Sequence, residues 1–344
     1  MKKRVTVIAK IMLCSTAVIA ALFVLCYLAT IGTYTVPRTV VDDASLPRVA
    51  LNGKLFHAES FGDPAHPVVI VVHGGPGWDY RYLLTLKSLS DDFFVVFYDQ
   101  QGTGLSPRDD PKKITLESSI EDLDAFVDHY GKGRKVDLIG HSWGAMLVSA
   151  YLGRHPGKIG HAVLAEPGFL TTEMMQQANI KFGPRWEAGF LAMAATMWFR
   201  SLHVNGPDKD AAMDYFIGQV GPYANTEYYC NNIVPDSAAM HWRAGPRAGE
   251  AIIRSAMDEK GALHIDLIKG VEQFTTPVLF LASECNQRIG KSHQEKQAKS
   301  FSQARMETIK GSGHAMFGEK PKESIAIVRK YLKSRSYKEN TWTR

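Results

Sequence analysis

The most constraining feature of the sequence is a Gly-His-Ser-Trp-Gly motif at residues 140–144, which lies between two strong secondary-structure signals. The apolar run at 136–139 predicts a strand buried on both faces, and residues 145–155 predict a helix. The two glycines allow a sharp turn from strand to helix and a close approach by neighbouring backbone. Such a turn exposes the hydroxyl of Ser142 above the helix N-terminus, which makes Ser142 a candidate nucleophile.

Strand and helix patterns alternate on both sides of this motif. Short runs of β-branched and aromatic residues predict strands, and longer segments with apolar residues at helical spacing predict helices that cover them. The predicted strands are 49–51, 55–61, 68–72, 93–98, 136–139, 162–165, 278–281 and 304–309, and the predicted helices are 115–130, 145–155, 292–301 and 322–332. This alternation predicts the α/β class, with a mostly parallel sheet flanked by helices.

The alternation stops after residue 167 and resumes near residue 271. The intervening stretch is rich in aromatic residues, methionine, glycine and proline, and it contains helical patterns but few strand signals. We therefore predict one core domain formed by 49–167 and 271–335, with a helical cap inserted at 168–270. Residues 34–48 contain two prolines and an acidic pair, which are typical of a linker, and residues 1–33 form a separate N-terminal segment.

The N-terminal segment is apolar and follows a basic cluster within the first ten residues. Residues 11–31 provide the ~20 apolar residues that a helix needs to cross a bilayer core. A cleaved signal peptide is the alternative, but its apolar region is usually only about 7–15 residues long. We expect an uncleaved single-pass membrane anchor, with a cytoplasmic N-terminus and the rest of the chain in the periplasm or outside the cell.

Charge and cysteine content exclude several functions. The formal net charge is +5, and most of it comes from the basic N-terminus, so the body lacks the basic face of a nucleic-acid-binding protein. Cys230 and Cys285 are the cysteines beyond the predicted anchor, and they either form one disulfide or remain free thiols. Neither has the spacing of a metal ligand, and we expect neither a metal nor a cofactor.

Two further motifs supply partners for Ser142. His314 ends a Gly-Ser-Gly-His sequence directly after the last predicted strand, where a general base is expected. A His-Gly-Gly-Pro-Gly sequence at 73–77 follows the strand at 68–72. Its bare backbone lets N–H groups face a developing oxyanion, and we predict the N–H groups of Gly75 and Trp143 as the donors.

These motifs resemble those of the proline iminopeptidase family of α/β hydrolases. The resemblance is carried by residues 73–77, by Asp-Gln-Gln-Gly-Thr-Gly-Leu-Ser at 99–106 and by residues 140–144, in this order. It covers roughly 68–166 and 276–332. The resemblance implies an α/β-hydrolase fold and a Ser-His-acid enzyme that releases an N-terminal residue, often proline, from peptides.

The acid of the triad does not follow directly from the resemblance. Many α/β hydrolases have Gly-x-x-Asp after the strand at 278–281, whereas this chain has Asn286 at the Asp position. Asparagine cannot stabilise an imidazolium, and Asp→Asn in a triad can reduce the rate ~10⁴-fold. We predict that Glu284, in the same loop, is the acid, with Glu166 and Asn286 itself as alternatives. Glu284→Gln should then lower kcat far more than Glu166→Gln.

The resemblance also indicates which residues bind the substrate. The family binds the free amine of its substrate with carboxylates of the cap, and the candidates here are Glu187, Glu227 and Glu250, with Trp186 and Trp242 as aromatic walls. Such a cap suits a small peptide or a small, lipid-like acyl group. We expect a peptidase of the proline iminopeptidase type. The alternatives are an esterase or lipase of the same fold and a non-catalytic hydrolase-fold membrane protein.

Overall fold

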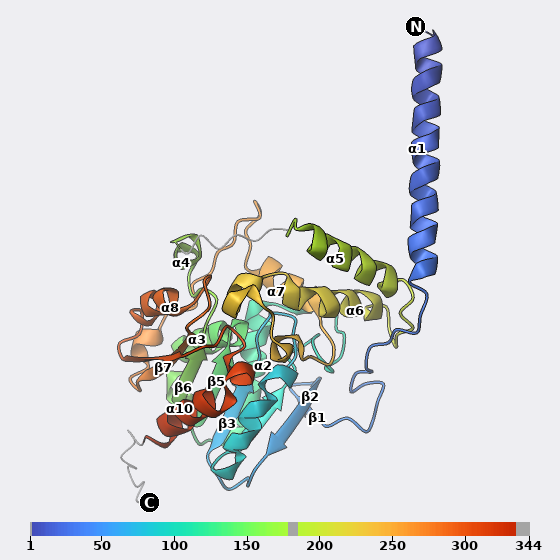
Figure 1. Cartoon of the computed structure of the whole chain (residues 1–344). Coiled ribbons are helices and arrows are strands. Elements are labelled where there is room, and N and C mark those ends of the chain that lie inside the picture. Colours follow the sequence, from blue (N-terminus) through green and yellow to red (C-terminus); the bar gives the residue numbers. More distant parts are fainter. Residues whose placement is uncertain (1, 178–184, 335–344) are drawn as a thin grey trace, which may run out of the picture.

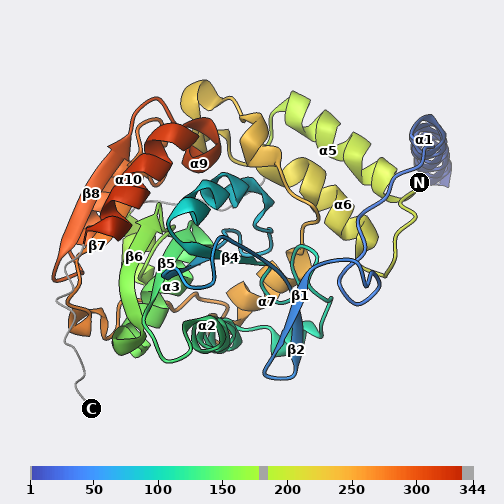
Figure 2. The ribbon, with the colours of Figure 1, turned by 90° about the horizontal axis from the view of Figure 1, so that it is seen from below.

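A sheet of eight strands forms the centre of the described chain (Figures 1 and 2). The computed structural model describes residues 2–177 and 185–334, and the side chains of residues 2–11 are not described. The strands are β1 (Arg48–Leu51), β2 (Lys54–Phe61), β3 (Val68–Val72), β4 (Phe94–Tyr98), β5 (Val136–His141), β6 (Ile159–Ala165), β7 (Val278–Ser283) and β8 (Ala304–Ile309). Their order is β1-β2-β4-β3-β5-β6-β7-β8, and all neighbours are parallel except β1–β2 and β2–β4.

Helices cover both faces of the sheet. Because side chains alternate along a strand, Val68, Ile70 and Val72 of β3 pack on one face, and Val69 and Val71 pack on the other. The first face is covered by α2 (Leu116–Gly131) and α3 (Trp143–Arg154), and the second by the 3₁₀ segment η1 (Arg81–Asp91) and α10 (Pro321–Lys333). The predicted α/β class and parallel sheet are confirmed, whereas η1 was not among the predicted elements.

Short helices follow β7 and β8. They are α8 (Lys291–Ala298) and α9 (Met316–Glu319). Helix α2 begins where the sequence indicates, because Thr115 and Ser118 form a capping box: each side chain accepts the backbone N–H of the other residue.

Between β6 and β7 the described chain is helical. It contains α4 (Thr172–Gln177), α5 (Ala188–Ser201), α6 (Ala211–Val220) and α7 (Pro246–Ser255), joined by short 3₁₀ turns. We call residues 168–270 the helical segment. Helices α5 and α6 pack against each other, and both lie above the carboxyl end of the sheet in Figure 1.

A buried ion cluster holds the helical segment together and ties it to the core, where Nε of Arg108 donates to Asp214 at 3.0 Å. The guanidinium of Arg243 is fully buried and donates to Asp214 at 2.7 Å and to Asp208 at 2.6 Å. It also donates to the carbonyl of Pro37 at 3.1 Å, which attaches the linker. Because Arg108 also binds Asp214, two arginines face two carboxylates, and losing either acid would leave one positive charge uncompensated.

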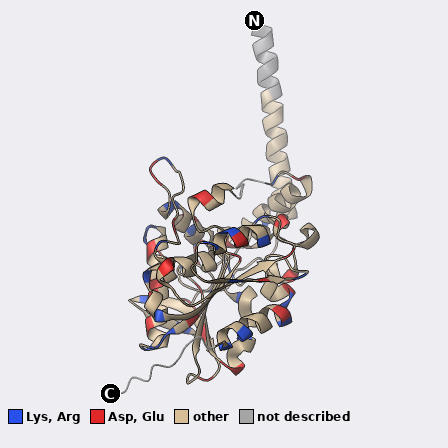
Figure 3. Cartoon of the chain, turned by 90° about the vertical axis from the view of Figure 1, so that its left-hand side faces the viewer, with Lys and Arg blue, Asp and Glu red and all other residues tan. Residues whose placement is uncertain are grey.

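Helix α1 (Lys2–Ala29) projects away from this body (Figure 1). Its residues Met12–Ala29 have a mean hydropathy of 2.3, and none of this stretch is buried against the protein. In Figure 3 this part of α1 carries no residue coloured as Lys, Arg, Asp or Glu, whereas such residues are spread over the body. The helix is therefore long and apolar enough to cross a membrane, a property that it shares with signal sequences.

Candidate active site

The turn between β5 and α3 holds Ser142 in a strained conformation. Its φ is 54° and its ψ is −119°, values that a residue with a side chain seldom adopts. The neighbouring glycines are required by close contacts: a Cβ on Gly144 would lie 2.0 Å from the carbonyl oxygen of Val72. The backbone N–H of Ser142 donates to the carbonyl of Ala165 at 2.9 Å. The Ser142 side chain does not cap α3, so its hydroxyl is not engaged by the helix.

His314 lies in the loop after β8 and lines the same pocket as Ser142. Its backbone N–H donates to the carbonyl of Tyr228 at 2.8 Å, and its ring stacks on that of Tyr228 with centroids 5.0 Å apart. The helical segment therefore helps to hold the imidazole. The predicted pair of Ser142 and His314 is brought together from two distant parts of the sequence.

Glu166 is the carboxylate that contacts the imidazole. Nδ1–H of His314 donates to Oε2 of Glu166 at 2.7 Å, and Glu166 is completely buried. Its Oε1 accepts hydrogen bonds from the backbone N–H and the hydroxyl of Ser283, both at 2.6 Å. The side-chain amide of Asn286 donates to Oε2 at 2.8 Å. Four donors thus compensate the burial of one charged group.

Glu284, our preferred acid, does not face His314. It is exposed, and its Oε2 accepts the backbone N–H of Gly311 at 2.8 Å. The reason is that side chains alternate as the chain leaves β7: Ser283 points inward and Glu284 points outward. Asn286 points inward again, but it supports Glu166 rather than replacing an acid. The geometry therefore favours the alternative, Glu166.

Gln100 links the two loops that carry the predicted oxyanion donors, Gly75 and Trp143. The backbone N–H of Gln100 donates to Nε2 of His73 at 3.0 Å, and its side-chain amide donates to the carbonyl of His73 at 2.9 Å. Its Oε1 accepts the indole N–H of Trp143 at 2.9 Å. Gly75 lines the pocket beside Ser142 and has a φ of 132°, in the range that favours glycine. The loops that carry the two predicted donors are thus fixed relative to each other.

His141 supports His314 from the other side. The hydroxyl of Tyr82 accepts the N–H of Gly74 and donates to Nδ1 of His141, and Nε2–H of His141 donates to the carbonyl of His314; all three distances are 2.8 Å. Burial, together with the neighbouring His314, holds the pKa of His141 well below its ordinary value of 6.5. A neutral ring with its proton on Nε2 matches these hydrogen bonds.

A disulfide joins Cys230 in the helical segment to Cys285 in the loop after β7. Cys285 lies beside Asn286, and its backbone N–H donates to the carbonyl of Ser312 at 2.9 Å. The bridge therefore connects the helical segment to both loops that surround the imidazole. It decides the question that the two cysteines left open in the sequence.

Comparisons with known proteins agree with this architecture. Residues 67–197 match the family model described as "alpha/beta hydrolase fold". A proline iminopeptidase of Lactobacillus helveticus is 27% identical over 278 residues, which cover 77% of this chain and 90% of that protein. The crystal structure of a Mycobacterium smegmatis proline iminopeptidase has a TM-score of 0.57 at 19% identity and covers 83% of this chain and 97% of that one. An enol-lactonase from Burkholderia xenovorans LB400 has a TM-score of 0.54 at 16% identity, with coverage of 83% and 99%.

The chain has the α/β-hydrolase fold and resembles the proline iminopeptidases. Its pocket at the carboxyl end of the sheet has a volume of about 190 Å³. The pocket is lined by the loops at 74–82 and 141–142, by His314 and by residues 221–241 of the helical segment. Its aromatic and methionine lining includes Trp78, Tyr82, Tyr228, Tyr229 and Met240, and none of the described lining residues is acidic.

The predicted substrate-binding residues do not line this pocket. Each glutamate pairs with a nearby arginine: Glu187 with Arg185, Glu227 with Arg288 and Glu250 with Arg254. Trp186 is 75% exposed. Trp242 packs edge-on against Tyr80 with ring centroids 4.9 Å apart. Trp78 was missed, although it directly follows the glycine-rich motif at 73–77 and could have been found from that position.

No cluster of metal-binding side chains is present in the described residues. The chemistry that the site offers comes from its own groups: a half-buried hydroxyl that lines the pocket, an imidazole oriented by a buried carboxylate, and backbone donors on two fixed loops. This set can form and break an acyl-enzyme.

Proposed function

We propose that the protein is a serine hydrolase whose triad is Ser142, His314 and Glu166. The observation that carries the proposal is the hydrogen bond from Nδ1–H of His314 to the buried carboxylate of Glu166, in a pocket that Ser142 also lines. Nε2 of His314 would accept the proton of Ser142 as the hydroxyl attacks the substrate carbonyl, and would later return it to the leaving group. Glu166 holds the imidazole in the required tautomer and stabilises the imidazolium.

The oxyanion is stabilised by the N–H groups of Gly75 and Trp143. Trp143 directly follows Ser142, and Gly75 lies across the pocket, which are the two positions from which donors reach a tetrahedral intermediate in this fold. The contacts of Gln100 with His73 and Trp143 preorganise both loops, so the donors need little rearrangement during the reaction.

The preferred substrate is a small ester or amide without a free amine. A peptidase that binds an N-terminal amine needs an acidic partner in its pocket, and the described lining residues provide none. Glu187, Glu227 and Glu250 each have an arginine partner outside the pocket. The volume of about 190 Å³ is below the ~300 Å³ at which pockets for drug-sized ligands begin, which favours a small acyl group.

An aminopeptidase of the proline iminopeptidase type is the second candidate. The 27% identity to the Lactobacillus helveticus protein over most of both chains supports it. Under either function we propose that the helical segment acts as the cap, because residues 221–241 form one side of the pocket.

We also propose that α1 anchors the enzyme in a membrane, with its catalytic body on the side opposite the cytoplasm. The basic N-terminus before an uncharged span supports this orientation. The Cys230–Cys285 disulfide supports it independently, because disulfides persist mainly in oxidising compartments outside the cytoplasm.

The test compares two reporter substrates on the full-length enzyme in detergent micelles. We expect turnover of p-nitrophenyl acetate and little turnover of proline p-nitroanilide, together with covalent labelling by a fluorophosphonate. Ser142→Ala should abolish both turnover and labelling. Efficient cleavage of the proline amide would favour the aminopeptidase, and labelling that persists in Ser142→Ala would overturn the triad.

A further inference from the structure

Helix α5 exposes an apolar face to its surroundings. The exposed positions Leu191, Ala195, Trp198 and Leu202 recur every three or four residues and therefore share one side of the helix. Leu191, Trp198 and Leu202 are 41%, 42% and 43% exposed. No charged residue occurs from Ala188 to the end of this face except Arg200, which lies on a different side.

A water-exposed helix of this protein has a different outer surface. Helix α10 exposes Lys322, Glu323, Lys330 and Lys333 and turns its apolar residues toward the sheet. On α5 the outward positions are apolar instead. Single exposed apolar side chains are common, but a continuous stripe of them indicates an interaction surface.

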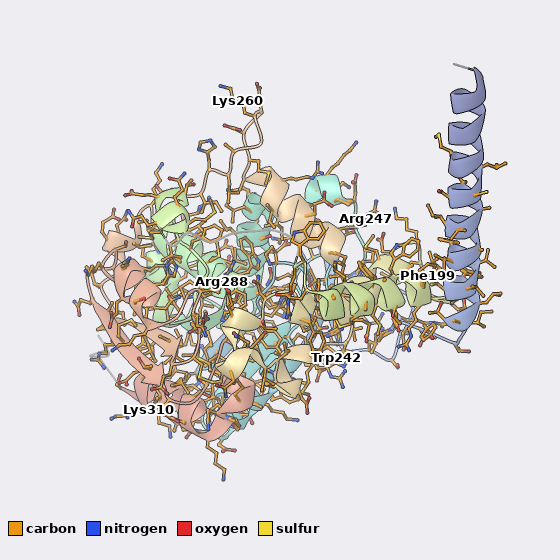
Figure 4. The ribbon with its side chains drawn as sticks, turned by 45° about the horizontal axis from the view of Figure 1, so that its top comes forward. Phe199, Trp242, Arg247, Lys260, Arg288 and Lys310 are labelled. Atoms are coloured by element: carbon orange, nitrogen blue, oxygen red, sulfur yellow. A yellow bond between two sulfur atoms is a disulfide. The ribbon has the colours of Figure 1, made fainter. Side chains whose placement is uncertain are left out.

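The apolar face of α5 is continuous with α1. The ring of Phe23 in α1 lies 5.2 Å from that of Phe199 and 6.1 Å from that of Trp198, measured between centroids. Nε2–H of His203 donates to the carbonyl of Tyr27 at 3.0 Å. Figure 4 shows Phe199 at the end of α5 that adjoins α1.

The chain that leaves α1 is attached to the same end of α5. The backbone N–H of Asn205 donates to the carbonyl of Tyr34 at 3.0 Å, and the guanidinium of Arg200 lies 5.6 Å from the centre of the Tyr34 ring. These contacts fix the junction of the two helices. In Figure 1, α5 runs across the direction of α1 rather than along it.

The contact with Phe23 sets the depth of α5 relative to a membrane. Phe23 precedes the end of α1 at Ala29 by six residues, or about 9 Å at 1.5 Å per residue. Helices that lie in a membrane interface bury their apolar face by about 5–10 Å. A span that ends near Ala29 therefore places Trp198 at interfacial depth, where tryptophan is enriched.

We propose that α5 is an interfacial helix whose face of Leu191, Ala195, Trp198 and Leu202 rests in the lipid surface from which α1 emerges. This inference rests on the proposed membrane anchor. The lipid surface covers apolar area that water would otherwise contact, and α1 and α5 together hold the body at two points. Because α5 packs on α6, which leads directly into the pocket-lining residues, the docking holds the helical segment next to the membrane.

Spin labels on the full-length chain test the proposal in phosphatidylcholine vesicles that contain a minority of phosphatidylglycerol. Cys14 and Cys26 are replaced by alanine, and a single label is attached at Leu191→Cys on α5, Leu22→Cys on α1 or Ala326→Cys on α10. Collision rates with oxygen, which partitions into lipid, are compared with those of a nickel chelate that stays in water. An unchanged near-ultraviolet circular dichroism spectrum shows that each labelled chain is folded.

We expect oxygen-dominated collisions at Leu191→Cys and Leu22→Cys, and nickel-dominated collisions at Ala326→Cys. A label at Leu191→Cys that is as nickel-accessible as the α10 label, while Leu22→Cys is in lipid, overturns the docking of α5 alone. Nickel access at Leu22→Cys overturns the anchor and the docking together. Shielding of Leu191→Cys from both reagents, with dipolar broadening between labels, identifies a second copy of the chain as the partner and also overturns the proposal.

Discussion

The loops after β6 and β7 lie side by side at the carboxyl edge of the sheet, and each contains a glutamate. Glu166, after β6, is completely buried and accepts four hydrogen bonds. Glu284, after β7, is exposed and accepts one backbone N–H. The two residues share the same charge and the same edge of the sheet, but only one can act on the imidazole.

The difference between these loops lies in what surrounds each carboxylate. The β7 loop contributes Ser283 and Asn286 as donors to Glu166, so the loop that carries the acid in many α/β hydrolases supplies the supporting groups here. An ionised carboxylate is tolerated in a buried position only when such donors are present. Burial and hydrogen-bond donors, rather than the position of a loop, therefore decide which carboxylate can serve as the acid.

The strongest test of this comparison is the pair of variants Glu166→Gln and Glu284→Gln. Glu166→Gln keeps the side-chain shape but removes the charge that stabilises the imidazolium, so kcat should fall ~10⁴-fold. Glu284→Gln changes an exposed group and should alter kcat by no more than about twofold. Steady-state ester hydrolysis by both variants measures the two losses in kcat. A larger loss for Glu284→Gln would identify Glu284, in the loop after β7, as the acid.

Exchanging the carboxylate and the amide between the two loops tests whether the acid can act from either loop. The side-chain amide of Asn286 and Nδ1–H of His314 donate to the same oxygen of Glu166, so a carboxylate at 286 would lie close to the imidazole. Glu166→Gln/Asn286→Asp should recover roughly tenfold to a hundredfold in kcat over Glu166→Gln, the range expected for coupled neighbours. If the double variant is no faster than Glu166→Gln, a carboxylate acts on the imidazole only from the loop after β6.

Much of the fold and part of the site could be predicted from the sequence because the signals are local. The strands are buried on both faces, so they occur as continuous apolar runs that are hard to mistake. Ser142 and His314 follow such strands in glycine-rich turns, and parallel strands bring their carboxyl ends to one edge. Strand order and loop position were therefore sufficient to place these two residues in one pocket.

The acid and the substrate-binding residues depend on side-chain direction, which local patterns do not encode. Glu166 has a φ of 44°, a conformation that usually indicates glycine or asparagine, so the sequence carries no sign that this glutamate turns inward. Residue type alone indicated Glu187, Glu227 and Glu250 as substrate-binding carboxylates. Glu227, in the helical segment, pairs with Arg288, in the loop after β7, and only the tertiary fold creates this contact.

A smaller effect is expected when one supporting donor of Glu166 is removed. Ser283→Ala deletes the hydroxyl that donates to Oε1 but keeps the backbone N–H bond to the same oxygen. Losing one hydrogen bond to a charged group should lower kcat by about tenfold. Ser312→Ala is the matched control, because its buried hydroxyl donates to the carbonyl of Ile309 and not to Glu166. Equal losses in both variants would mean that loop packing, rather than support of the acid, is responsible.

The smallest expected effect concerns the other support of His314, the hydrogen bond from His141 to its carbonyl. The pKa of His141 is lower in the folded state than its ordinary value of 6.5 in the unfolded state. At a pH below 6.5 the folded protein therefore binds fewer protons than the unfolded chain, and the free energy of unfolding falls as the pH drops. One such group contributes at most about 1.4 kcal/mol per pH unit, which corresponds to a few degrees in Tm. The wild type should therefore lose more Tm than His141→Phe between about pH 7.5 and about pH 5.5, whereas His264→Phe, on the surface, should follow the wild type. Parallel Tm curves for wild type and His141→Phe would show that His141 is not held neutral beside His314.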